Sequence, residues 1–130
     1  MWENKKTISF HPIGYVENVI NETLAPDKIK AVESRIVVDP GLVEGLRGLK
    51  PGQKILVVFH FHRSRGFDLL QHPRGNRNRL PRGVFALHSP RRPNPVGVTV
   101  ASLVEIKGNV LRVQGLDAIN GTPVLDIKSA

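Results

Sequence analysis

The sequence contains no cysteine, and its 130 residues include only one tryptophan and one tyrosine. Without cysteine the chain has no disulfide, no thiolate metal ligand and no cysteine nucleophile. It also has no run of about 18 apolar residues, the length that a membrane-crossing helix requires. Residues 1–6 contain two lysines but are not followed by the apolar segment of a secretion signal. We therefore expect a cytoplasmic protein that does not enter a membrane.

The length and the charge of the chain narrow its class further. A chain of 130 residues is long enough to bury a core, but it is too short for a doubly wound sheet with a second domain. We expect one domain over residues 1–130. The formal net charge is +8 and the pI is about 10.5, which favours nucleic acid as a partner. A membrane surface is the other anionic choice, but the sequence shows no basic amphipathic helix.

Most of this charge lies in one third of the chain. Residues 60–92 contain eight arginines, no lysine and a single acid, Asp68, so this segment carries a formal charge of +7. Guanidinium groups form paired hydrogen bonds with phosphates and stack on bases. Residues 63–82 show neither helical nor strand periodicity. The pattern predicts a long arginine-rich loop that binds an anionic polymer and becomes ordered on it.

The rest of the sequence indicates an all-β fold. Ten prolines and twelve glycines separate short segments rich in valine and isoleucine, which is typical of strands. We expect a small, closed antiparallel β-barrel of six or seven strands, because closure leaves no exposed strand edges. A glycine-containing loop at 107–109 predicts the last hairpin, and leucine spacing predicts one short helix at 41–49. The expected strands are 8–20, 34–39, 54–62, 83–87, 96–106, 110–116 and 123–127.

Two histidines stand out in the expected strand 54–62. Alternation places Ile55, Val57, Phe59 and Phe61 on one face and the histidines on the other. We interpret His62 as a ligand-binding group or proton acceptor at the barrel mouth and His60 as a structural residue. A His-x-His metal pair is a further possibility, but a catalytic metal requires at least a third protein ligand.

The segment Arg92-Pro93-Asn94-Pro95 is conformationally restricted, because each proline fixes its own φ and restricts the preceding residue. It either presents Arg92 and Asn94 to a ligand or forms an ordinary rigid turn. Asp117 follows an expected strand. Its carboxylate either accepts a hydrogen bond from a ligand or caps the turn at Asn120-Gly121.

Four segments together resemble the TsaA-like, or TrmO, family. They are residues 83–97 (GVFALHSPRRPNPVG), 116–128 (LDAINGTPVLDIK), 12–16 (PIGYV) and 59–62 (FHFH). The resemblance implies a small β-barrel that dimerises and binds S-adenosylmethionine between its subunits. It also implies methylation of N6 of threonylcarbamoyladenosine, beside the anticodon of tRNA.

The resemblance also assigns residues. His88 stands where the family usually has arginine, Asn120 stands where aspartate is common, and residues 26–28 replace the usual Pro-Arg-Gln. The chemistry of the side chains, apart from the resemblance, makes His62 and Asp117 the expected proton acceptors. The arginine cluster likewise gives the expected RNA-binding residues, which are Arg65, Arg74, Arg77, Arg79, Arg82 and Arg91. The expected donor-binding residues are Pro26, Asp27, Lys28, His62, Arg63, His88, Arg92, Asn94, Val98, Asp117, Asn120, Gly121, Thr122 and Pro123.

The hypothesis that follows is an SN2 transfer of a methyl group from S-adenosylmethionine to a nitrogen of tRNA. Such a transfer depends mainly on holding nucleophile, methyl group and sulfur in line. The alternative is a non-catalytic RNA-binding β-barrel that uses the same arginines. Its weakness is the low aromatic content, which leaves few surfaces for base stacking once the core is filled. A His-x-His metalloenzyme is the third interpretation.

Overall fold

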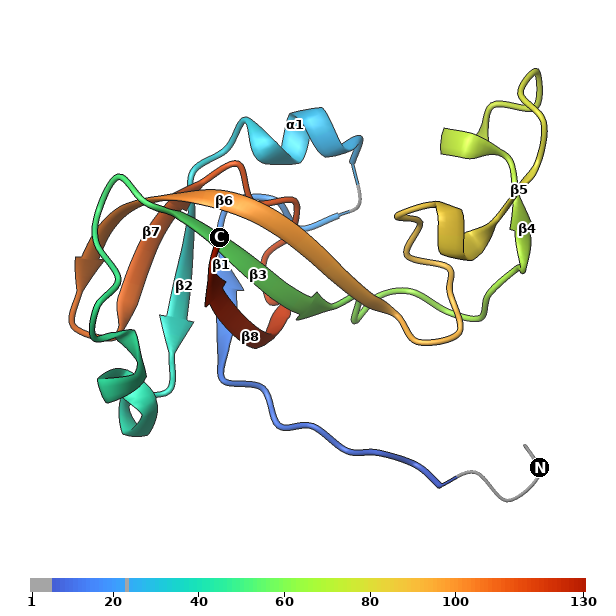
Figure 1. Cartoon of the computed structure of the whole chain (residues 1–130). Helices are drawn as coiled ribbons and strands as arrows, with labels where there is room; N and C mark the ends of the chain where they lie inside the picture. The colour runs from blue at the N-terminus through green and yellow to red at the C-terminus, as the bar shows by residue number, and fades with distance from the viewer. Residues whose placement is uncertain (1–5, 23) are drawn as a thin grey trace.

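The computed structural model describes residues 6–22 and 24–130 and shows a barrel with a separate arm (Figure 1). Six antiparallel strands close the barrel in the order β1-β2-β7-β6-β3-β8. This confirms the expected all-β class and the closed barrel. The strands are β1 (Gly14–Glu17), β2 (Ser34–Val38), β3 (Lys54–His60), β6 (Val96–Lys107), β7 (Val110–Gln114) and β8 (Pro123–Ser129).

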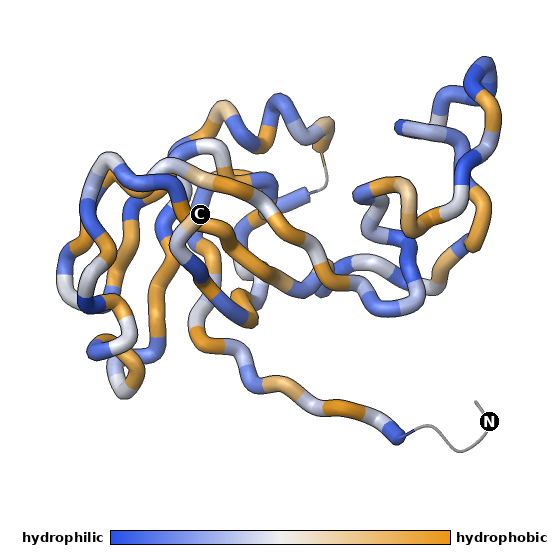
Figure 2. The backbone as a smooth tube through the Cα atoms, in the orientation of Figure 1, coloured by the Kyte–Doolittle hydropathy of each residue, from blue (hydrophilic) through white to orange (hydrophobic). Residues whose placement is uncertain are grey.

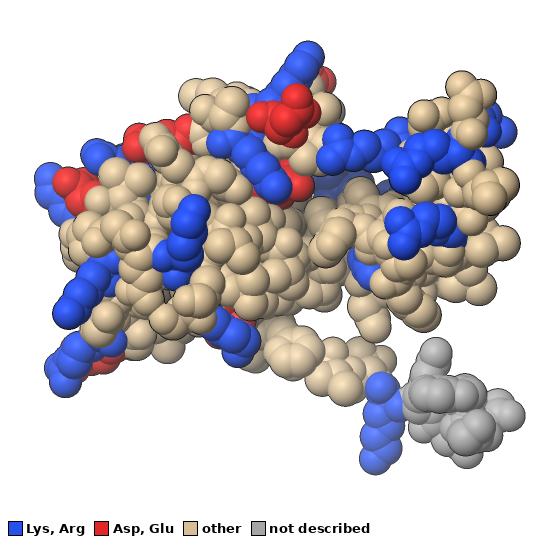
Figure 3. All heavy atoms as spheres, turned by 45° about the horizontal axis from the view of Figure 1, so that its top comes forward, with Lys and Arg blue, Asp and Glu red and all other residues tan. Residues whose placement is uncertain are grey.

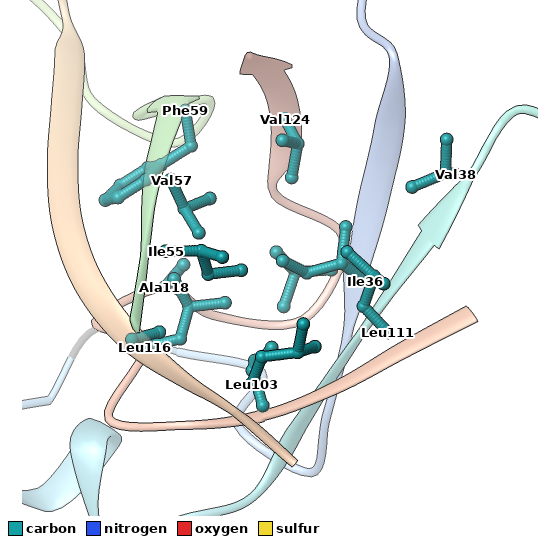
Figure 4. Packing of buried hydrophobic residues seen from close by; sticks show 13 residues of the cluster. Ile36, Val38, Ile55, Val57, Phe59, Leu103, Leu111, Leu116, Ala118 and Val124 are labelled. Atoms are coloured by element: carbon teal, nitrogen blue, oxygen red, sulfur yellow. The ribbon is translucent and has the colours of Figure 1, made fainter. Parts of the chain in front are cut away.

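The core of the barrel is built by strand alternation. On β3, Ile55, Val57 and Phe59 share one face, as the alternation of residues 54–62 predicted, and the structure shows that this face points inward, with each residue at most 2% exposed. Figure 2 shows that hydrophobic residues follow the barrel strands, and Figure 4 shows residues of six strands and of the β7–β8 loop meeting in the interior. Each such side chain contributes about 1.5–3 kcal/mol when it leaves water. The barrel is therefore a rigid support for the segments at its ends.

The end of β3 carries an aromatic pair that depends on a glycine of β6. The rings of Phe59 and Phe61 meet edge to face, with centroids 5.2 Å apart and an interplanar angle of 77°. Phe59 is directly opposite Gly97 in the β3–β6 ladder. A Cβ on Gly97 would lie 2.6 Å from Cζ of Phe61 and 2.8 Å from Phe59. Only glycine leaves room for the two rings against β6.

Residues 61–95, which we call the arm, leave the barrel between β3 and β6 (Figure 1). The arm contains β4 (Leu70–Gln71), β5 (Arg82–Gly83) and the 3-10 turns η3 (Pro73–Gly75) and η4 (Val84–Ala86). β4 and β5 pair only with each other, so they form a two-stranded sheet apart from the barrel. Residues 63–82 thus contain short regular elements that their sequence did not predict.

Three other segments differ from the prediction. The expected strand 83–87 is wrong, because only Gly83 pairs with β4 and the chain then turns into η4. The expected helix 41–49 is a 3-10 turn, η2 (Pro40–Leu46), in which the Asp39 carboxylate accepts from the N–H of Gly41. The expected strand 8–20 pairs only over β1, where Gly14 packs against the backbone of Val37.

The α-helix α1 (Pro26–Lys30) was not predicted. With five residues it is too short to show helical periodicity, although it buries Ile29. Before β1, residues 6–12 lead away from the barrel (Figure 1), and Ile8 and Phe10 in this segment are exposed. No helix in residues 6–22 and 24–130 is long and apolar enough to cross a membrane.

Candidate ligand-binding site

A cavity of about 540 Å³ lies where α1, the end of β3, the β7–β8 loop and the base of the arm meet. Figure 3 shows this side of the molecule hollowed between barrel and arm, with lysine and arginine side chains on both rims. The volume is typical of a small-molecule site. The wall is mostly apolar, and its apolar lining residues include Leu24, Pro26, Ile29, Phe59, Phe61, Ala118 and Ile119.

The β7–β8 loop forms a fixed wall of this cavity. The Asn18 amide donates to the Ala118 carbonyl at 2.8 Å and to the Ser34 hydroxyl at 3.0 Å. The Thr122 hydroxyl is buried and donates to the Ile119 carbonyl at 2.7 Å. Gly121 between them has φ +85°, a conformation that suits glycine. Backbone and side-chain hydrogen bonds therefore hold the loop that carries Asp117.

The two histidines of the β3 end have different surroundings. His60 is the last residue of β3, and its Nδ1 lies 3.1 Å from the Pro95 carbonyl oxygen. His62 lies beyond the strand and lines the cavity. Burial, helped by the charge of Arg63 and by His60, lowers the pKa of His62. A neutral His62 imidazole can accept a proton or a hydrogen bond near neutral pH.

No metal centre is formed by the residues that the structure describes. Within 6–22 and 24–130, no group of three or more His, Cys, Asp or Glu side chains lies close enough to hold a metal ion. The two histidines also no longer share one regular strand, because β3 ends at His60.

Asp117 is the acidic side chain of the cavity wall. It is half-buried, and this burial raises its pKa, although the charges of Lys30 and Arg74 partly offset the effect. Arg74 belongs to the tip of the arm, so the arm places a positive charge within reach of this carboxylate. A desolvated carboxylate is a stronger base than one in water.

A second cavity of about 350 Å³ adjoins the first. It opens between η4 and the start of β6, and its own lining includes Phe85, Arg92, Val96 and Val98. The two cavities share four residues, which form a common wall: Phe59, Phe61, His88 and Asp117.

The structure divides the expected donor-binding residues into three groups. The larger cavity is lined by Pro26, His62, Arg63, His88, Asp117 and Thr122. The smaller one is lined by Arg92 and Val98, again with His88 and Asp117. Neither cavity is lined by Asp27, Lys28, Asn94, Asn120, Gly121 or Pro123.

The expected RNA-binding arginines also separate. At the base of the arm, Arg91 forms an ion pair with Asp68 at 3.2 Å and donates to the Arg65 carbonyl at 2.6 Å. Arg65 donates to the Ser64 carbonyl at 3.1 Å. The tip of the arm carries four exposed arginines, Arg74, Arg77, Arg79 and Arg82. Within the described residues, their side chains form no hydrogen bond or ion pair.

Two arginines outside this set are also bound to backbone. Arg63 donates to the Asn21 carbonyl, and Arg92 donates to the carbonyls of Leu87 and Ser89 at 2.9 and 3.1 Å. Arg92 therefore fixes the turn before Pro93-Asn94-Pro95. The amide of Asn94 is exposed at the surface.

The sequence did not identify the apolar part of the site. Phe59 and Phe61 were predicted to share one face of a strand, but not to line a ligand cavity. Leu24 and Ile29 come from α1 and the segment before it, where no periodicity exists. Ala118 and Ile119 are adjacent in a loop, so no spacing distinguishes them.

Comparisons with a family model and with individual proteins agree on one family. Residues 22–129 match the family described as the tRNA-methyltransferase O N-terminal domain. A probable S-adenosyl-L-methionine-binding protein of Pyrococcus abyssi is 38% identical over 125 residues, covering 93% of this chain and 67% of the relative. The human tRNA (adenine(37)-N6)-methyltransferase is 34% identical over 130 residues, and this match covers 90% of this chain and 29% of the human protein.

Solved structures agree in fold. The crystal structure of TrmO from Pseudomonas aeruginosa superposes with a TM-score of 0.75 at 30% identity, and the match covers 96% of this chain. The chain spans 56% of that structure.

Proposed function

Because the chain belongs to the tRNA-methyltransferase O N-terminal domain family, we propose that it transfers a methyl group from S-adenosylmethionine to N6 of an adenine in a tRNA anticodon loop. Threonylcarbamoyladenosine is the acceptor that we favour. The observation that carries the proposal is the 540 Å³ cavity, which contains Asp117 and His62 and opens beside the arginine-rich arm. A non-catalytic RNA-binding barrel would have no need of this cavity.

The larger cavity fits the chemistry of the methyl donor. S-adenosylmethionine carries a sulfonium cation, which a carboxylate such as Asp117 and the aromatic surface of Phe61 both favour. Its amino acid carboxylate suits the guanidinium groups of Arg63 and Arg65, which line the cavity and keep further N–H donors beside those that bind the Asn21 and Ser64 carbonyls. The apolar wall suits the adenosyl group.

The transfer itself requires little of the protein beyond alignment and one proton acceptor. The lone pair of N6 attacks the methyl carbon, and the carbon–sulfur bond breaks with its electrons moving to sulfur. N6 carries a proton that has to leave. Burial raises the pKa of Asp117 and lowers that of His62, so both are suited to act as acceptors near neutral pH.

Calorimetry tests the proposal directly. The protein should bind S-adenosylmethionine at micromolar to millimolar concentration with one donor per cavity. If no heat is detected at millimolar donor while tRNA still binds, the chain is an RNA-binding module and the enzyme proposal fails.

The arm would hold the RNA. The exposed arginines at its tip suit phosphates, whereas those at its base already donate to the protein's own carbonyls and to Asp68. Single-stranded RNA loops also offer unpaired bases for stacking. We therefore place the RNA on the tip, in the cytoplasm where tRNA is found.

Replacing Arg74, Arg77, Arg79 and Arg82 together by glutamine should weaken tRNA binding and flatten its salt dependence. The slope of log Kd against log salt should fall by about 0.7 for each phosphate contact that is lost. Fluorescence anisotropy with labelled tRNA between low and high salt measures both. The matched control replaces Arg35 and Arg47, which form exposed ion pairs on the barrel side. An unchanged slope in the tip variant would place the RNA elsewhere.

We also propose that the protein is a homodimer with the donor site near the interface. The outer face of β6 supports this, because Val96, Val98 and Val100 are 38%, 46% and 51% exposed in one row. Val98 also lines the smaller cavity. An apolar row beside a site is typical of an interface. A monomer mass in light scattering at micromolar concentration would contradict the proposal.

A further inference from the structure

The two cavities meet at one carboxylate. Asp117 and His88 line both, with Phe59 and Phe61 between them. A group transfer needs two ligands whose reacting atoms meet at a single point. The larger cavity takes the donor in the function proposed above. The smaller one, at about 350 Å³, is then placed for the acceptor. This assignment moves Arg92 and Val98, which the resemblance implied as donor-binding residues, to the acceptor side.

Phe85 gives the smaller cavity a surface for a base. Its side chain is 80% exposed, although its neighbour Val84 is 1% exposed and anchors the turn. The N–H of Val84 donates to the Leu69 carbonyl at 2.8 Å, and that of Leu87 donates to the Val84 carbonyl at 3.1 Å. The buried Val84 therefore anchors the turn, and the neighbouring Phe85 ring remains exposed to solvent. An exposed aromatic ring on a fixed turn is suited to stack on an unpaired base.

The start of β6 contributes an apolar part of the lining of the smaller cavity. Val96 and Val98 line it, and Gly97 between them lets the Phe59 and Phe61 rings approach the strand. Arg92, whose guanidinium is bound to the Leu87 and Ser89 carbonyls, fixes the turn that separates Phe85 from β6. The lining of the smaller cavity therefore combines the ring of Phe85, the valines of β6 and Asp117, and we call this cavity the slot.

We propose that this slot holds the acceptor adenine, flipped out of the anticodon loop, with its face on Phe85 and its N6 directed at Asp117. The inference rests on the methyltransferase function proposed above. In the transfer, N6 forms its bond to the methyl carbon as the carbon–sulfur bond breaks, leaving a neutral thioether. The N6 proton passes to the Asp117 carboxylate and then to solvent. His88 donates a hydrogen bond to a ring nitrogen of the base. Enzymes that modify a base commonly take it out of the stack in this way.

Replacing Phe85 by alanine tests the assignment. At saturating S-adenosylmethionine, the KM for tRNA should rise about tenfold or more, the effect expected from one lost base–aromatic contact. Donor affinity measured by calorimetry should be unchanged, because Phe85 does not line the larger cavity. Phe85→Trp should keep most of the activity, whereas Phe85→Leu should behave like alanine. Phe10→Ala, which removes another exposed ring, should alter nothing.

The activity of the wild type tests the proposed function, and the Phe85 variants test the acceptor slot separately. If the wild-type protein transfers no methyl group, the proposed function fails first. If the wild type is active and Phe85→Ala has an unchanged KM for tRNA, the slot is not the acceptor site. If Phe85→Leu keeps full activity, or if Phe85→Ala changes the mass in light scattering, the ring serves an apolar contact between subunits and the assignment is overturned.

Discussion

Replacing Asp117 by asparagine should lower kcat for methyl transfer by roughly 10²- to 10⁴-fold, the contribution typical of a positioned proton acceptor. Asparagine keeps the shape of the side chain but cannot take the N6 proton. Single-turnover assays with radiolabelled S-adenosylmethionine and tRNA measure the step itself. Asp126→Asn is the control, because Asp126 pairs with Lys128 on β8 and lines neither cavity. A kcat within a factor of a few of the wild type would assign the proton elsewhere.

The same substitution should make the protein more stable. Burial raises the pKa of Asp117 above its ordinary value of 3.8, so the folded state favours the protonated form. The stability that this provides is fully present below pH 3.8 and is lost as the pH rises through the folded pKa. At neutral pH the buried charge is therefore a cost that Asp117→Asn removes. We expect a higher Tm for Asp117→Asn at pH 7 and a smaller difference in acid. A lower Tm at pH 7 would contradict this account.

The activity of the wild type should fall on the acid side as Asp117 takes up a proton. Because the pKa of Asp117 is raised, the fall should begin closer to neutrality than for an ordinary aspartate. The pH profile of kcat measures this, and it should lose that limb in Asp117→Asn.

Phe59→Ala should lower the free energy of unfolding by about 3–5 kcal/mol, a large part of the 5–15 kcal/mol typical of a domain. Phe59 is 2% exposed, packs edge to face on Phe61 and separates the two cavities. The substitution removes core packing and the common wall together. Urea denaturation followed by circular dichroism measures the loss. Phe10→Ala removes a ring that is 74% exposed and should change the stability little. A loss below about 1 kcal/mol for Phe59→Ala would mean that the cavities are not rigidly separated.

The barrel could be predicted because its strands carry local signals. The alternation along β3 separated its two faces, and the turn at Gly108, which has φ +62°, identified the β6–β7 hairpin. These signals depend only on neighbouring residues. The arm gives no such signal, because β4 and β5 are two residues each and pair with nothing else. The five-residue helix α1 also leaves no measurable period.

The site could be predicted only in part, because its residues come from distant segments. Pro26, His62, His88 and Asp117 are expected from motifs, and the fold brings them to one cavity. The motifs do not show that His88 and Asp117 stand between two cavities, or that Arg91 and Arg92 bind the protein's own carbonyls. Those facts depend on how the arm returns to the barrel, which no local pattern specifies.

Nucleoside mass spectrometry of tRNA incubated with the purified protein and S-adenosylmethionine tests the proposed methyl transfer most directly. We expect threonylcarbamoyladenosine to gain the mass of one CH₂ group, the gain to require the donor, and Asp117→Asn largely to abolish it. A wild-type protein that binds both tRNA and donor but leaves every nucleoside mass unchanged would contradict the central claim.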